Sequence, residues 1–115
     1  MIEFKSNFKK CCKYKQLKYP DILNYEAYFS IVISGKVFFE EPNFPLLEFL
    51  YYVNQWEETQ NKSLEYISIE TEDNPLIVFK YNNGRYLISS PWQNFKCVDE
   101  FTKEEIISAL KKIST

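Results

Sequence analysis

Apolar side chains recur with helical spacing between Phe44 and Glu58. They fall at Leu46, Phe49, Leu50, Val53 and Trp56. This i, i+3, i+4, i+7 spacing places them on one face of a helix. Asn43 can cap the N-terminus, and Pro45 suits the first turn, where its missing N–H would have no helical partner. The pattern predicts a helix over residues 44–58 that packs on an apolar sheet.

Alternating apolar and polar side chains predict strands before this helix. Residues 2–9 alternate and indicate a half-buried first strand. Residues 25–40 indicate a hairpin, with its turn at Ser34-Gly35. A two-residue loop would place Phe38 on the buried face of this hairpin, and one extra loop residue would place Phe39 there. The register therefore stays open at this stage.

A second hairpin is predicted over residues 76–90. Two β-rich runs flank Asn83-Gly84, the preferred pair for a type I′ turn. This turn sets Tyr81 opposite Tyr86 and Phe79 opposite Ile88.

Residues 64–69 and 95–101 also alternate and predict two further strands. Thr102 and Glu105 then form a capping box, which indicates a helix over residues 103–113.

The order of elements predicts one α+β domain over residues 1–115, with an antiparallel sheet of about six strands. We expect both helices, 44–58 and 103–113, on one face of the sheet. The other face would carry a largely apolar set, namely Tyr28, Val32, Tyr66, Val78 and Leu87. Monomers rarely expose large apolar patches. We therefore expect this face to be covered by residues 10–24, by a second copy in a homodimer, or by a partner protein.

The composition argues against most enzyme chemistry. The chain has no histidine, which removes the Ser-His-Asp and Cys-His catalytic sets and the usual zinc and iron ligands. The two glycines, Gly35 and Gly84, are both used in predicted turns, so no glycine-rich phosphate loop can be written. We predict that the protein is not an enzyme and that it binds no metal or cofactor.

Cysteines and carboxylates do not change this prediction. The three cysteines, Cys11, Cys12 and Cys97, have no zinc-binding spacing. We interpret them as reduced thiols, with Cys97 a small core residue. Paired acids such as Glu57-Glu58 occur at the ends of predicted elements, where carboxylates are ordinarily solvated.

Charge is unevenly distributed along the chain. Residues 1–18 hold six lysines and one acid, whereas the remainder holds eight basic and fifteen acidic residues. Lysines commonly protect an edge strand from aggregation, and the anionic remainder would repel nucleic acid. With no signal-like or membrane-spanning apolar run, we expect a cytoplasmic protein without a membrane or nucleic-acid partner.

Several residues are candidates for binding a protein partner. Trp92, in Ser90-Pro91-Trp92-Gln93, is either a core residue at a strand end or an exposed anchor. An acidic turn supplies Glu70, Glu72 and Asp73, which would attract a basic partner. These residues join the five side chains of the second sheet face as partner-binding candidates.

Two stretches carry a resemblance to known families: ISGKVFFEEPNFPLLEFLYYVNQW (Ile33–Trp56) and NPLIVFKYNNGRYLISSPWQNF (Asn74–Phe95). They resemble small uncharacterised bacterial families of low-GC Gram-positive species, catalogued as domains of unknown function. They are also similar in style to immunity proteins encoded beside polymorphic toxins. The resemblance implies no catalytic or binding residue.

Two functional hypotheses follow. The first is a non-enzymatic protein-binding domain, with an immunity protein that neutralises a basic toxin as its specific form. The alternative is a small-ligand-binding or enzymatic domain that uses carboxylates and tyrosines in a pocket between helices and sheet.

Overall fold

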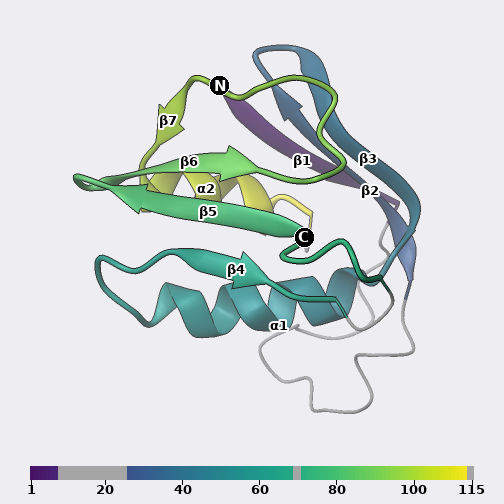
Figure 1. Ribbon diagram of the computed structural model, residues 1–115, viewed down its shortest axis with the longest axis horizontal. Helices are drawn as coiled ribbons and strands as arrows, with labels where there is room; N and C mark the ends of the chain where they lie inside the picture. Colours follow the sequence, from purple (N-terminus) through teal and green to yellow (C-terminus); the bar gives the residue numbers. More distant parts are fainter. Residues whose placement is uncertain (8–25, 69–70, 114–115) are drawn as a thin grey trace.

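The computed structural model describes residues 1–7, 26–68 and 71–113, which form two antiparallel sheets and two helices (Figure 1). The elements are β1 (Ile2–Ser6), β2 (Ala27–Ile33), β3 (Lys36–Phe44), α1 (Leu46–Glu57), β4 (Leu64–Tyr66), β5 (Ile77–Asn82), β6 (Arg85–Ser89), β7 (Glu100–Phe101) and α2 (Lys103–Lys111). Strands β1–β3 form one sheet and β4–β7 the other, each in sequence order. The predicted α+β class is confirmed.

The expectation of one sheet of about six strands is wrong, because the strands divide into sheets of three and four. The edge of β3 does not receive β4. Instead, the backbone N–H of Asn94 donates to the carbonyl of Phe38 (2.8 Å), and its side-chain amide donates to the carbonyl of Val37 (3.1 Å). The loop after β6 thus satisfies part of the β3 edge and joins the two sheets.

The β2–β3 hairpin contains a bulge that settles its register. Ser34 and Gly35 form the turn with positive φ angles of 52° and 79°. Pairing shifts between Ile31 and Val32, so that Val32 faces Val37 but Ile31 faces Phe39. An extra residue in one strand of a pair is a β-bulge. As a result, both Phe38 and Phe39 are fully buried, which simple alternation does not allow.

The β5–β6 hairpin has the predicted register. Asn83 and Gly84 have positive φ angles of 49° and 88°, Tyr81 faces Tyr86, and Phe79 faces Ile88. The other two predicted strands are shorter than expected. Only Leu64–Tyr66 and Glu100–Phe101 pair as strands.

Both helices follow their predicted patterns, with one correction. The predicted N-cap, Asn43, lies in β3, and Pro45 is the N-cap of α1 without a side-chain hydrogen bond. The apolar stripe of α1 is buried and includes Trp56. The capping box of α2 is confirmed, because Thr102 and Glu105 each accept a hydrogen bond from the other's backbone N–H.

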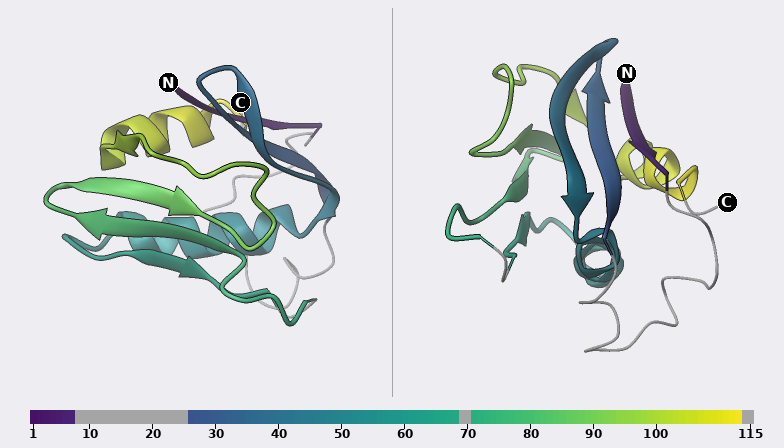
Figure 2. Two further views of the ribbon diagram at one scale, coloured as in Figure 1. Left: turned by 45° about the horizontal axis from the view of Figure 1, so that its top comes forward. Right: turned by 90° about the vertical axis from the view of Figure 1, so that its right-hand side faces the viewer.

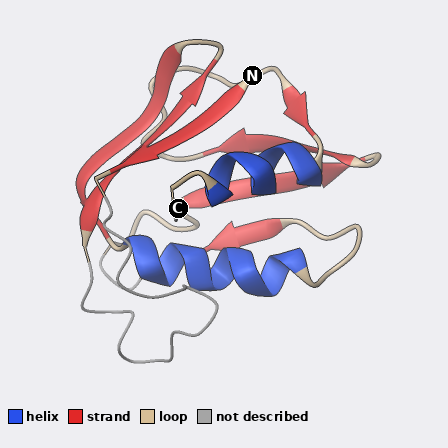
Figure 3. Cartoon of the chain, turned by 180° about the vertical axis from the view of Figure 1, so that it is seen from behind, coloured by secondary structure: helices blue, strands red, loops and turns tan. Residues whose placement is uncertain are grey.

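Both helices lie on the same side of the four-stranded sheet, as predicted (Figure 3). The three-stranded sheet curves across one end of this arrangement, and α2 also packs along β1 (Figure 2). Phe49 of α1 connects the two sheets, because its ring lies 5.5 Å from that of Phe29 in β2 and 6.2 Å from that of Phe79 in β5. In the described part of the chain, neither helix is long and apolar enough to cross a membrane.

The groove beside Trp92

The five side chains expected together on one sheet face are divided by the structure. Tyr66 is fully buried, and its hydroxyl donates to Glu48 of α1 over 2.6 Å. The pairing of Tyr66 with Ile77 places it on the inner face of the four-stranded sheet, beside the helices. The expectation that Tyr66 points away from the helices is therefore wrong.

Tyr28 and Val32 belong to the other sheet. Val32 is buried, and the Tyr28 hydroxyl donates to Glu40 over 2.6 Å, which raises the pKa of Tyr28. Of the expected set, only Val78 and Leu87 share the outer face of the four-stranded sheet, and both are partly buried. Alternation predicts which residues share a face of one strand, but it does not predict to which sheet the strand belongs.

Four of the predicted partner-binding residues come together at one end of the four-stranded sheet, namely Glu72, Asp73, Val78 and Trp92. An open groove of about 550 Å³ lies on its outer side. It is lined by Glu72, Asp73, Asn74, Pro75, Val78, Ser89, Ser90, Pro91 and Gln93. Trp92 does not line this groove itself, but its sequence neighbours Pro91 and Gln93 do. Glu70 lies outside the described residues.

Trp92 is held in place on several sides. Its indole Nε1–H donates to Asp73 Oδ2 over 2.8 Å, and its backbone N–H donates to Ser90 Oγ over 3.1 Å. The indole lies nearly parallel to the ring of Phe39, at 7° with 6.3 Å between centroids. The residue nevertheless remains 37% exposed. One part of Trp92 thus packs on the core and another part faces solvent, and its role as a partner anchor stays a prediction.

The acidic turn is fixed by the side chain of Asn74. Its amide oxygen accepts from the backbone N–H of Ser68 (2.9 Å), and its amide N–H groups donate to the carbonyls of Ser68 (2.9 Å) and Thr71 (2.7 Å). The backbone N–H of Asp73 donates to Thr71 Oγ1 (3.1 Å). These bonds hold Glu72 and Asp73 at the surface, where both are exposed.

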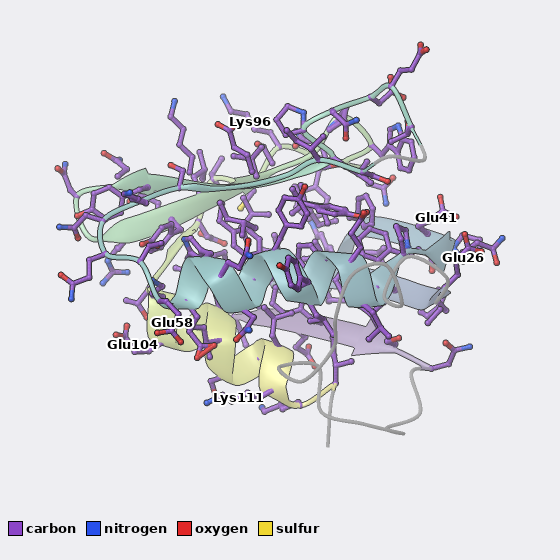
Figure 4. All side chains as sticks on the ribbon, turned by 90° about the horizontal axis from the view of Figure 1, so that it is seen from below. Glu26, Glu41, Glu58, Lys96, Glu104 and Lys111 are labelled. Atoms are coloured by element: carbon purple, nitrogen blue, oxygen red, sulfur yellow. The ribbon has the colours of Figure 1, made fainter. Side chains whose placement is uncertain are left out.

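The carboxylates of the groove are not neutralised. Among the residues that the structure describes, neither Glu72 nor Asp73 pairs with a lysine or arginine. A smaller hollow of about 190 Å³ is lined by Trp92 and also by Glu41. Glu41 lies at the opposite end of the molecule from Glu58 and Glu104 (Figure 4). Trp92 therefore lines the hollow that carries Glu41, and it is hydrogen-bonded to Asp73 of the larger groove.

A buried carboxylate was missed by sequence reasoning. Glu48 is 1% exposed in α1 and accepts the hydrogen bond from Tyr66. Tyr52 lies one helical turn after Glu48, and its ring is 5.1 Å from that of Tyr66. Burial and then the charge of Glu48 raise the pKa of Tyr52. The available signal was Glu48 itself, an acid flanked by apolar residues near the start of the helix.

A second polar contact, which is partly buried, joins the two helices. Lys103 Nζ donates to the carbonyls of Trp56 (2.9 Å) and Thr59 (2.5 Å), and it lies 4.7 Å from the centroid of the Trp56 ring. Burial lowers the pKa of Lys103. A cation at a helix C-terminus complements the helix dipole, so this lysine stabilises the end of α1. Glu58 and Glu104 lie at the same end of the molecule (Figure 4).

Metal-ligating residues do not gather in the described part of the chain. There, no three cysteine, aspartate or glutamate residues come close enough to hold a metal ion. Cys97 is buried, as predicted, and its Sγ contacts the carbonyl of Asp99 at 3.2 Å. Cys11 and Cys12 lie outside the described residues.

Comparison with known proteins identifies a family. A family model described as a domain of unknown function (DUF7878) matches residues 1–115. No curated protein and no solved structure matches the chain.

Proposed function

The chain belongs to the family described as a domain of unknown function (DUF7878), and we propose that it is a protein-binding domain without catalytic activity. The observation that carries this proposal is the placement of Trp92. This residue is partly exposed and lines a hollow, yet it is held in place by Asp73 and Phe39. Tryptophan is enriched among the residues that dominate binding energy at protein interfaces.

A pre-positioned aromatic side chain lowers the cost of binding. Ordering a mobile side chain at an interface costs roughly 0.5–1.5 kcal/mol. The hydrogen bond from Trp92 to Asp73 and the parallel contact with Phe39 already order this ring. Little further ordering of this side chain is therefore needed when a partner binds.

The charge of the groove indicates the chemistry of the partner. Glu72 and Asp73 line it without an ion pair to a lysine or arginine of the described residues, and Glu41 lines the smaller hollow at Trp92. Complementary charges speed association and exclude partners of the wrong sign. We therefore propose a basic protein as the partner. In its specific form, the proposal is an immunity protein that covers a basic toxin, in keeping with the resemblance of the sequence.

Affinity capture with matched variants tests this proposal. Wild type, Trp92→Ala and Val98→Ala would be immobilised and exposed to native lysate at low salt, and retained proteins would be identified by mass spectrometry. Val98 is 78% exposed and does not line the groove, so it controls for loss of an exposed apolar side chain. We expect a basic protein that is retained by wild type and Val98→Ala and lost with Trp92→Ala.

The reverse pattern would contradict the proposal. If Trp92→Ala retains the same proteins as wild type, the groove is not the binding surface. Thermal unfolding of each variant in solution, before immobilisation, checks that a loss of captured protein does not arise from unfolding of the variant.

A ligand-binding or enzymatic role has one observation in its favour, the buried pair of Glu48 and Tyr66 with Tyr52 beside it. Neither Glu48 nor Tyr66 lines the hollows at Trp92. A thermal-shift screen of small molecules against wild type and Glu48→Gln tests this role. A compound that stabilises wild type but not the variant would favour it over the protein-binding proposal.

A further inference from the structure

We infer that Asn83 is a site of spontaneous deamidation, and that the folded turn between β5 and β6 holds this reaction back. The inference does not rest on the proposed protein-binding function. It follows from the conformation and exposure of two adjacent residues, Asn83 and Gly84, at the tip of the β5–β6 hairpin (Figure 1).

The sequence places the most reactive asparagine of the chain in this turn. Asparagine is a thermolabile residue, and Asn83 alone among the asparagines of the sequence precedes a glycine. The backbone nitrogen of Gly84, which no side chain shields, loses its proton to solvent and forms a bond to Cγ of Asn83. The bond between Cγ and Nδ2 breaks, ammonia leaves, and a five-membered succinimide ring remains.

Water then opens the succinimide ring and completes the reaction. Attack on the side-chain carbonyl gives aspartate with the original backbone. Attack on the main-chain carbonyl gives isoaspartate, whose backbone runs through the side chain and is longer by one carbon. In both cases one amide and one water become one carboxyl group and one ammonia, so no oxidant or cofactor is needed.

Packing does not shield the pair from water. Both Asn83 and Gly84 are exposed. A Cβ added to Gly84 would meet no atom of the described residues within 4 Å, apart from its two chain neighbours. Any protection of Asn83 in the folded protein therefore comes from the backbone of the turn.

The backbone of the turn keeps the reacting atoms apart. Asn82 pairs with Arg85, and the φ angles of Asn83 and Gly84 are 49° and 88°, which is a type I′ turn. The first central residue of this turn has a ψ of about +30°. At this ψ the carbonyl oxygen of Asn83 lies near its Cβ, and the nitrogen of Gly84 lies on the opposite side. The flat succinimide ring requires that nitrogen beside Cβ, so the ring can close only after the turn opens.

Opening of the turn therefore has a permanent consequence. Loop tips open locally at a lower free energy than the whole domain, and the loss of ammonia makes the reaction irreversible. Isoaspartate adds one backbone carbon to a two-residue loop, which no longer fits the pairing of Asn82 with Arg85. The modified fraction thus increases with the time that the hairpin tip spends open.

The test follows the full chain in native buffer and in concentrated guanidinium chloride, both at mildly alkaline pH. Trypsin cuts after Lys80 and Arg85 and releases residues 81–85 as one peptide. Mass spectrometry detects the replacement of an amide by a carboxyl group, fragmentation distinguishes Asn83 from Asn82, and chromatography separates aspartate from isoaspartate.

We expect Asn83 to react in the denatured chain and at least about tenfold more slowly in the folded chain, which corresponds to an opening free energy of about 1.4 kcal/mol. Tyr86→Ala removes a ring that lies 5.1 Å from Trp56 and 5.4 Å from Tyr81, between ring centroids. This variant should react faster than wild type in native buffer and at the same rate in denaturant, whether it opens locally or unfolds.

Ser34→Asn provides a matched control in the other hairpin. Ser34 and Gly35 have φ angles of 52° and 79°, so the substitution places the same sequence pair in the same kind of turn. Residue 34 of this variant should also react slowly in the folded chain and should match Asn83 in denaturant.

Three results would overturn the inference. The first is a denatured chain in which Asn83 stays unmodified, because the pair would then not be a reactive site. The second is an equal rate for Asn83 in the folded and denatured chains. The third is a folded Ser34→Asn protein in which residue 34 reacts at the denatured rate, because a type I′ turn would then give no protection.

Discussion

The indole N–H of Trp92 donates a 2.8 Å hydrogen bond to Asp73 across 19 residues of sequence. It joins the loop after β6 to the turn before β5, at the open end of the β5–β6 hairpin. The same residue packs on Phe39 of the other sheet. One partly exposed side chain thus connects three segments of the chain.

Asp73→Ala should lower the free energy of unfolding by about 1 kcal/mol, the usual net worth of one hydrogen bond. Asp73→Asn should cost less, because the amide oxygen can replace the carboxylate as acceptor. Urea unfolding of both variants, alone and combined with Trp92→Phe, measures the coupling. In the Trp92→Phe background the cost of Asp73→Ala should fall towards zero. An unchanged cost would mean that Asp73 acts through another contact.

Trp56→Ala should destabilise the domain by ~3–5 kcal/mol, the cost of emptying a large buried aromatic site. Trp56 is 4% exposed, contacts Phe79 and Tyr86, and lies under Lys103. Chemical denaturation measures the loss, with Trp92→Ala as a less buried comparison. A change below about 1 kcal/mol would show that the α1 stripe does not form the core.

Tyr66→Phe should cost ~1–3 kcal/mol, because it leaves the buried Glu48 without this donor. Replacing both partners, with Glu48→Leu and Tyr66→Phe together, should cost less than the sum of the two single changes. A double-mutant cycle by urea unfolding gives the coupling energy. Additive single effects would show that the 2.6 Å contact does not stabilise the fold.

Glu105→Gln should remove part of the pH dependence of stability. The hydrogen bond from the backbone N–H of Thr102 lowers the pKa of Glu105. A carboxyl group with a lowered folded-state pKa contributes stability above its unfolded pKa and loses it as pH falls through the folded value. Wild type should therefore exceed Glu105→Gln in stability at neutral pH, and the difference should shrink as the pH falls below about 4.3, the usual pKa of glutamate. Denaturation midpoints across this range provide the measurement.

The outer face of the four-stranded sheet should not mediate dimerisation. Val78 and Leu87 are its partly exposed apolar residues in β5 and β6, and Lys80 and Ser89 pair directly with them. Val78→Glu with Leu87→Glu should leave the solution mass unchanged in light scattering. If the wild type is a dimer and this variant is a monomer, the hypothesis of a homodimer through that face would be supported instead.

Local signals in the sequence predicted local structure well. Asn83-Gly84 and the Thr102–Glu105 capping box each act within a few residues, and both are confirmed. The inner stripe of α1 was also predictable, because helical periodicity is carried by a single segment. The N-cap of α1 was not predictable in this way, because β3 continues through Phe44 and includes Asn43.

Contacts between residues far apart in the sequence could not be predicted from the sequence patterns. Leu64–Tyr66 can join the first sheet only if the outer edge of β3 is free to pair. Asn94, far along the chain, forms hydrogen bonds with that edge. The β2–β3 bulge buries both Phe38 and Phe39, which simple alternation along one strand does not predict. At the site, Trp92 and the acidic turn were recognised separately, but the hydrogen bond that unites them requires the fold.

The contact between Asn94 and β3 also bears on the order of folding. Within each sheet, consecutive strands pair, whereas Asn94 and Val37 are 57 residues apart. Closing a longer loop costs more chain entropy, so this tie forms after the hairpins that it connects. Contacts made after the folding transition state govern how slowly a native protein opens. We therefore expect the contacts of Asn94 with β3 to slow unfolding more than they speed folding.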